Sequence, residues 1–88
     1  MLTNMIWYFI TDITDSNASS LFIREAQFSL TYRDGIKTLC MNNKPVAIHS
    51  DGNIKLSKNC PKVILKLMAE ITSLPLQYFI HKRALNEI

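Results

Sequence analysis

The stretch that decides the fold runs from Asn53 to Ile88 and reads NIKLSKNCPKVILKLMAEITSLPLQYFIHKRALNEI. Its middle part carries apolar residues at i, i+3, i+4, i+7, i+8 and i+11, which is the spacing of one face of an α-helix. The residues of this stripe are Cys60, Val63, Ile64, Leu67, Met68 and Ile71. The stretch therefore predicts an amphipathic helix that follows a short strand at 54–56.

The ends of this helix are marked by residues with known capping and helix-breaking preferences. Ser57 or Asn59 can cap the first turn through a side-chain oxygen. Pro61 fits that first turn, because its missing N–H has no intrahelical partner there. Thr72-Ser73 with Pro75 is expected to end the helix, since the residue before a proline avoids helical geometry.

The segment after this helix is expected to be less regular. Residues 76–80 are apolar and partly aromatic, which predicts a short strand or a buried linker. His81 is expected to begin a last helical turn with Ala84, Leu85 and Ile88 on its inner face. The chain thus predicts one full helix and one short C-terminal helix.

The second helix start is the candidate functional site. His81, Lys82 and Arg83 sit together there, and helix N-termini present free N–H groups and a partial positive charge that favour phosphate. Lys58 adds a further cation before the first helix. These four residues are predicted to contact nucleic-acid phosphates; the simpler alternative is that Lys82 and Arg83 only solvate the end of the helix.

The preceding residues are expected to form an antiparallel meander. Asp-Gly pairs at Asp34-Gly35 and Asp51-Gly52 supply the positive φ angles of tight hairpin turns, and a third turn is expected over Asn42–Pro45. The predicted strands are 5–13, 27–32, 36–41, 46–48 and 54–56, with a brief apolar piece at 21–23 as an edge strand and a polar turn cluster at 15–20. We therefore expect an α+β fold, an antiparallel sheet of four to five short strands followed by the helices, in one domain of 88 residues divided into a β meander (1–56) and a helical part (57–88).

Composition and charge limit the classes of protein. Apolar residues make up 48% and charged residues 19% of the chain, which is typical of a globular domain. The formal charge of +3 is uneven. Residues 1–34 hold two basic and four acidic side chains, whereas residues 35–88 hold eight basic and three acidic ones. A basic C-terminal half can face phosphates or an acidic partner, or be a solvated lysine surface.

Catalytic and metal chemistry find little support in the sequence. Cys40, His49, Cys60 and His81 lack the close spacing by which one turn presents two metal ligands. No glycine-rich phosphate loop, activated nucleophile or acid–base pair is evident. We therefore expect no enzyme activity, no cofactor and no small-molecule substrate. The absence of a signal-like or membrane-spanning run, together with two cysteines read as reduced thiols, predicts a cytoplasmic protein without membrane contact.

The order of short hairpins, a Leu-Ser step, a helix with an adjacent apolar pair, a break and a basic helix start resembles the DNA-binding domain of winged-helix transcriptional regulators of the ToxR-like and OmpR-like kind. Leu56-Ser57 is similar to the step into the first helix, and Val63-Ile64 with Leu67 to that helix's core. Residues 79–85 are similar to the family pattern Val-Val-Ser-Arg-Glu-x-Leu, with His81 in the capping place and Leu85 in the buried leucine place. Asn43-Lys44-Pro45-Val46 is similar to a turn of the family's sheet. The resemblance covers residues 22–88.

The chain departs from the family at several points. The turn at 50–53 looks like an extra hairpin, and Asn86 stands where a second leucine is usual. The family's groove-reading helix and wing would come after Ile88, so the resemblance implies a truncated winged helix in which no residue inherits base reading.

Two functions follow from these expectations. The first is a small transcription-related regulatory protein that acts by association with a protein partner or a second copy, with weak phosphate contact to double-stranded DNA. The second is a protein-interaction or accessory module of a mobile element or pathogen with no nucleic-acid role. An unfinished winged helix would leave apolar surface open, and open apolar surface usually marks an interface.

Overall fold

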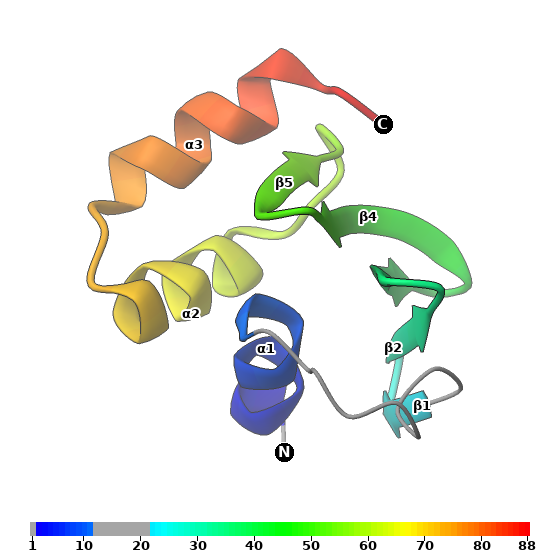
Figure 1. The fold of residues 1–88 in the computed structure, drawn as a ribbon. Helices are drawn as coiled ribbons and strands as arrows, with labels where there is room; N and C mark the ends of the chain where they lie inside the picture. The colour runs from blue at the N-terminus through cyan, green and yellow to red at the C-terminus, as the bar shows by residue number, and fades with distance from the viewer. Residues whose placement is uncertain (1, 12–21) are drawn as a thin grey trace.

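A computed structural model describes residues 2–11 and 22–88, in which a five-stranded antiparallel sheet packs with three helices (Figure 1). The elements in chain order are α1 (Leu2–Ile10), β1 (Phe22–Glu25), β2 (Phe28–Arg33), β3 (Ile36–Met41), β4 (Lys44–Ser50), β5 (Asn53–Leu56), α2 (Lys62–Thr72) and α3 (Leu76–Leu85). The predicted α+β class and the sheet of four to five strands are confirmed. The turn cluster predicted at 15–20 lies outside the described residues.

The sheet is a simple meander, because each strand pairs with the next one along the chain. The predicted turns at Asp34-Gly35 and Asp51-Gly52 are confirmed, and all four residues have positive φ angles between 52° and 78°. The third turn is shorter than expected and consists of Asn42 and Asn43, also at positive φ. Pro45 already belongs to β4, beside a register shift at Leu39/Cys40, and such a bulge tolerates a proline within a sheet.

One face of the sheet is buried and the other is open. The buried face carries Phe28, Leu30, Leu39, Ala47 and Leu56. Helix α1 packs against α2 and against β1, β2 and β3, while α3 packs against α2 and β5 (Figure 1). The opposite face presents the outward residues of each strand, including Phe22 and Ile36, to solvent.

The strand predicted over 5–13 is wrong, because residues 2–10 form the helix α1. Its aromatic and β-branched composition favours a strand, but its apolar residues also fit a helical period. Met5, Ile6 and Phe9 share one face and are completely buried, whereas Trp7 and Tyr8 are exposed. Packing of that face against α2 and the sheet outweighs the weak intrinsic preference of the side chains.

Helix α2 is confirmed in position but rotated from the predicted stripe. Three residues of the predicted stripe, Cys60, Ile64 and Met68, are buried as expected, whereas Val63 is 49% exposed and Leu65, which lies outside the stripe, is buried. The predicted caps are wrong, because Pro61 is the N-cap residue and no side chain caps it; the Ser57 hydroxyl accepts a bond from the Asn59 N–H at 3.1 Å. The predicted end at Thr72 is confirmed.

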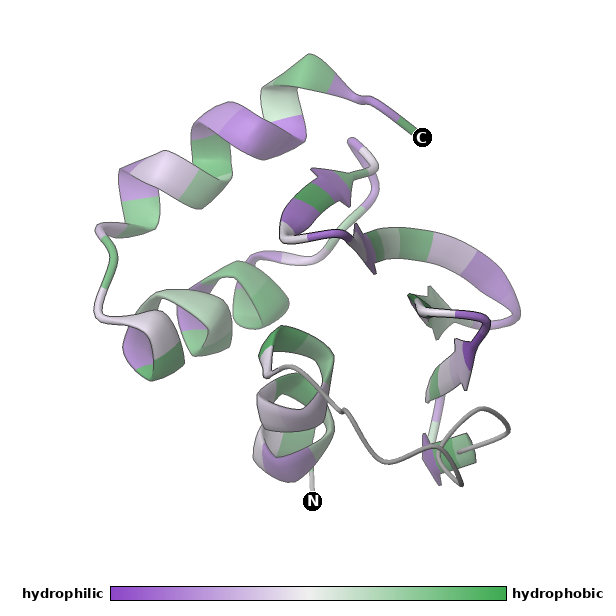
Figure 2. Ribbon diagram, in the orientation of Figure 1, coloured by the Kyte–Doolittle hydropathy of each residue, from purple (hydrophilic) through white to green (hydrophobic). Residues whose placement is uncertain are grey.

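The strand or linker predicted over 76–80 is also wrong, because α3 begins at Leu76 directly after its N-cap, Pro75. Phe79 is the fully buried residue of this helix, whereas the predicted inner residues Ala84, Leu85 and Ile88 are exposed. In Figure 2, α2 is apolar along most of its length, and polar and apolar segments alternate along α3. Helix α3 exposes both kinds of side chain to solvent, since Leu85 and His81 are both exposed.

Candidate functional site

The predicted basic residues lie at the opposite end of their helix from the end expected. Lys82 and Arg83 occupy the last turn of α3, and His81 immediately precedes them. A helix C-terminus carries a partial negative charge, so cations there stabilise the helix, and the free N–H groups that would bind a phosphate lie at the other end. The helix start predicted at His81 is therefore wrong, and the helix dipole does not favour a phosphate beside Lys82 and Arg83.

Lys82 is held by a backbone carbonyl group of β5, and Arg83 by one of the segment between β5 and α2. The Lys82 Nζ donates to the carbonyl oxygen of Ile54 at 3.1 Å, and the Arg83 Nη1 donates to that of Cys60, also at 3.1 Å. The Lys82 ammonium also lies 5.9 Å from the centroid of the Tyr78 ring, within cation–π range. Both basic side chains are half-buried.

Two further bonds join the same elements. The Asn86 side-chain oxygen accepts from the Lys58 backbone N–H at 3.0 Å, and the Glu87 N–H donates to the Leu56 carbonyl at 3.2 Å. We call Lys82, Arg83, Asn86 and Glu87 the C-terminal clasp. The clasp occupies carbonyl groups of Ile54 and Leu56 on β5, which would otherwise be available to a further strand.

The structure thus brings three of the four predicted site residues to one region. Lys58 is tied through its backbone to the end of α3, near Lys82 and Arg83, while the His81 side chain is exposed. The basic groups of the clasp serve the fold through their carbonyl contacts. Of the four predicted residues, Lys58 and His81 have exposed side chains.

A buried polar pair, which the sequence analysis missed, holds the end of α1. Lys37 and His49 are 4% and 6% exposed and face each other across β3 and β4. The Lys37 Nζ donates to the carbonyls of Tyr8, at 3.2 Å, and Thr11, and the His49 Nδ1 lies 2.8 Å from the Phe9 carbonyl oxygen. The Tyr8 and Phe9 carbonyls belong to the last turn of α1 and Thr11 lies just beyond it, where intrahelical partners run out. The strand alternation, which places Lys37 in phase with Leu39, is the signal that could have revealed the pair.

The thiols show no sign of activation. Burial raises the pKa of Cys60 to about 12, although the nearby Arg83 charge acts in the opposite direction. Burial also raises the pKa of Cys40, against a smaller lowering by its hydrogen bond with Ser29. Thiolate is the reactive form of cysteine, so neither side chain is primed as a nucleophile. Within residues 2–11 and 22–88, no group of three or more His, Cys, Asp or Glu could hold a metal ion.

An exposed stripe on α3 combines apolar and polar side chains. Tyr78 is 44% exposed and Leu85 is 52% exposed, and their separation of seven residues places them on one helical face. His81 and Lys82 lie between them, at i+3 and i+4 from Tyr78. We call Tyr78, His81, Lys82 and Leu85 the α3 stripe.

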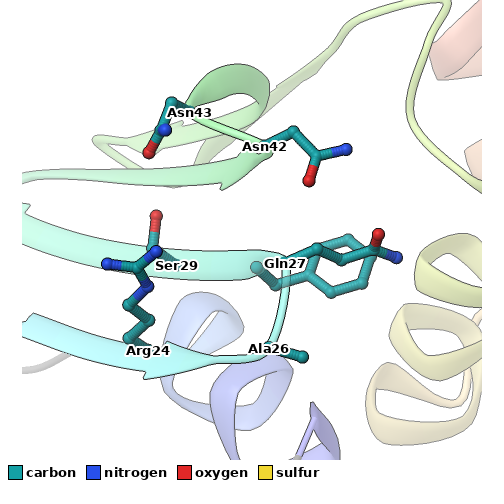
Figure 3. Close-up of a pocket in the computed structure, with 7 residues that line it drawn as sticks. Arg24, Ala26, Gln27, Ser29, Asn42 and Asn43 are labelled. Atoms are coloured by element: carbon teal, nitrogen blue, oxygen red, sulfur yellow. The ribbon is translucent and has the colours of Figure 1, made fainter.

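A polar hollow lies at one end of the sheet, where the β1–β2 and β3–β4 turns meet. Its volume is about 190 Å³. Figure 3 shows side chains from both turns and both neighbouring strands around it. Its polar lining consists of Arg24, Gln27, Ser29, Asn42 and Asn43. Nothing in the sequence motifs pointed to this hollow, because its residues come from four separate elements.

None of the helices in the described part has both the length and the apolar character needed to cross a membrane.

Comparisons with known proteins do not place the chain in a family. No family model, no curated protein and no solved structure matches the chain.

Proposed function

We propose that the chain is a small transcription-related regulatory protein that acts by association with another protein through the α3 stripe. The observation that carries the association is the exposure of Tyr78 and Leu85 on one helical face. Aromatic side chains are enriched at protein interfaces, and apolar groups gathered on an exposed face are typical of them. The winged-helix resemblance supplies the link to transcription.

The arrangement of the elements is consistent with that resemblance once two positions are reassigned. The adjacent apolar pair in the core of α2 is Ile64-Leu65 with Met68, one residue later than expected. In the family pattern a leucine follows the capping serine by four residues, and here the buried Phe79 follows the N-cap Pro75 by four. In this proposal, the antiparallel sheet and the two helices joined by Ser73–Pro75 correspond to the supporting part of a winged helix.

Charge on the stripe favours a different protein over a second copy of this chain. An antiparallel pair of α3 helices with Tyr78 of one copy against Leu85 of the other would bring the two Lys82 ammonium groups close together at the centre. Like charges in such a position oppose association. The stripe therefore fits a partner that presents apolar side chains to Tyr78 and Leu85 around a carboxylate, which would accept a further hydrogen bond from the Lys82 ammonium beside its bond to the Ile54 carbonyl.

Site-specific photo-crosslinking in the cells that make the protein tests this proposal. A photoreactive phenylalanine analogue is placed at position 78, at position 85, or at the control position 36, where Ile36 is 45% exposed on the open sheet face. We expect one protein to be captured from positions 78 and 85 and not from 36, and mass spectrometry to identify it as a component of the transcription machinery or its regulators.

Two results would count against the proposal in different ways. Equal capture from all three positions, or none from 78 and 85, would contradict association through the stripe. Selective capture of a protein unconnected with transcription would retain the interface and overturn the transcriptional role, which would favour an accessory interaction module.

A further inference from the structure

We propose that the polar hollow between the β1–β2 and β3–β4 turns binds a phosphate-type oxyanion. The central group is the Arg24 guanidinium, which no hydrogen bond or ion pair ties to another residue in the described part of the chain. A guanidinium presents its N–H donors as a planar fork that matches two oxygens of a phosphoryl group. This inference does not depend on the proposed protein association.

The other polar groups of the hollow suit an anion. Ser29 lies directly opposite Arg24 on the neighbouring strand, and Gln27, Asn42 and Asn43 add side-chain amides that can donate N–H groups. Figure 3 shows Arg24, Ser29 and Asn43 grouped on one side of the hollow, with Gln27 and Asn42 on the other. Among the described residues no carboxylate lines the hollow, so its lining carries no negative charge that would repel an anion.

The walls of the hollow are fixed by the backbone. The Asn42 N–H donates to the Gln27 carbonyl at 2.8 Å and so joins the two turns. Ala26, Asn42 and Asn43 adopt left-handed conformations, with φ angles of 51°, 51° and 66°, which set the directions of these turns. The backbone positions that carry the donor side chains are thereby fixed, which lowers the entropy that the site loses when it binds its ligand.

The volume selects the size of the ligand. The hollow measures about 190 Å³, whereas pockets for drug-sized molecules begin at about 300 Å³. It has room for an ion such as inorganic phosphate with some of its water. A phosphoryl group could come from the free ion or from the backbone of DNA, and the two sources share the same chemistry at Arg24.

Titration of the isotope-labelled full chain with inorganic phosphate, followed by two-dimensional nitrogen–proton NMR at constant ionic strength, tests the site. We expect saturable shifts of the Arg24 side-chain signal and of the Gln27 and Asn43 amides. Arg24→Gln should weaken binding about tenfold or more, because a charge-assisted hydrogen bond is lost. The phosphate affinity of Arg24→Lys should lie between those of the original protein and Arg24→Gln, since the charge stays while the planar fork of N–H donors is removed.

Arg33→Gln is the matched control, because Arg33 is exposed on β2 but lies outside the hollow. Unchanged phosphate binding in this variant supports the site. A short DNA duplex that shifts the same signals at lower concentration would also support it and identify a phosphodiester as the source. Shifts that do not saturate, equal weakening by Arg33→Gln, or acetate binding as tightly as phosphate would overturn the proposal. The dispersion of the spectra shows that each variant is folded.

Discussion

Lys37 and His49 face each other across β3 and β4 on the buried face of the sheet, and both reach carbonyl groups at the end of α1. The pair thus connects the first helix to the centre of a sheet that lies more than 25 residues away in sequence. Buried polar groups are costly unless they are paired, and here the unsatisfied end of a helix provides the acceptors. This connection leads to the first prediction.

Replacement of Lys37 by methionine should lower the free energy of unfolding by about 2 kcal/mol, because it leaves the Tyr8 and Thr11 carbonyls without their donor. Urea denaturation measures the change. Lys55→Met is the control, since Lys55 is exposed on the opposite face, and it should stay within about 0.5 kcal/mol of the original protein. Similar values for the two variants would show that the buried ammonium contributes nothing specific.

The C-terminal clasp gives a second prediction. Arg83→Met should reduce stability by about 1–2 kcal/mol, because the Cys60 carbonyl loses a charge-assisted bond. His81→Gln, two residues away and exposed, should change stability by less than about 0.5 kcal/mol. Hydrogen exchange of the backbone amides near the β5–α2 connection should accelerate in the first variant only.

The predicted phosphate contact can be tested against the clasp. Lys82 and Arg83 are engaged with carbonyl groups. We therefore expect Lys82→Ala/Arg83→Ala to lower the free energy of unfolding and to leave the affinity for duplex DNA unchanged. Electrophoretic shifts at several salt concentrations, with protein shown to be folded, measure that affinity. A salt-dependent shift that disappears in the folded double variant would show that these side chains do reach phosphates.

The buried thiol of Cys60 predicts a dependence on alkaline pH. Its pKa is raised from 9.0 to about 12, so between these values the unfolded chain releases a proton that the folded chain keeps. Stability from this group is complete below pH 9 and is lost as the pH rises, by at most about 1.4 kcal/mol per pH unit. The unfolding free energy should therefore fall more steeply between pH 9 and 11 in the original protein than in Cys60→Ala. Parallel curves would contradict the assignment.

The glycine of the β4–β5 turn offers a purely conformational prediction. Gly52 has a φ of +77°, and a Cβ placed on it would meet no atom of the described residues within 4 Å. Gly52→Ala should therefore cost about 1 kcal/mol through backbone strain alone, as measured by thermal unfolding. A loss several times larger would mean that the side chain meets an obstacle.

Local chemistry made much of the sheet predictable from the sequence. The Asp-Gly turns and the alternation over 27–32 depend on neighbouring residues, and the observed strands follow them. Helix α1 was missed because its aromatic composition favours a strand, and only contacts with α2 and the sheet select the helix. The predicted start of helix α3 lies five residues too late, at His81 instead of Leu76, because the apolar run 76–80 shows no clear period in isolation.

The candidate sites were harder to predict, since they depend on distant elements. The sequence marks Lys82 and Arg83 as adjacent basic residues, but it does not reveal their carbonyl partners at Ile54 and Cys60, which are more than 20 residues away. The hollow around Arg24 requires two turns to meet, which depends on the pairing of β2 with β3. Residue type indicated which side chains could act, whereas the tertiary contacts determine where they act.

The clasp on β5 also limits how copies of this protein can join. A sheet grows by adding strands at its edges, and unlimited growth requires two edges that accept a neighbour. Because carbonyl groups of Ile54 and Leu56 are occupied by Lys82 and Glu87, the β5 edge cannot accept one while α3 stays in place. Pairing through the other edge alone would give a dimer and no larger assembly, so the C-terminal clasp opposes the growth of a fibre.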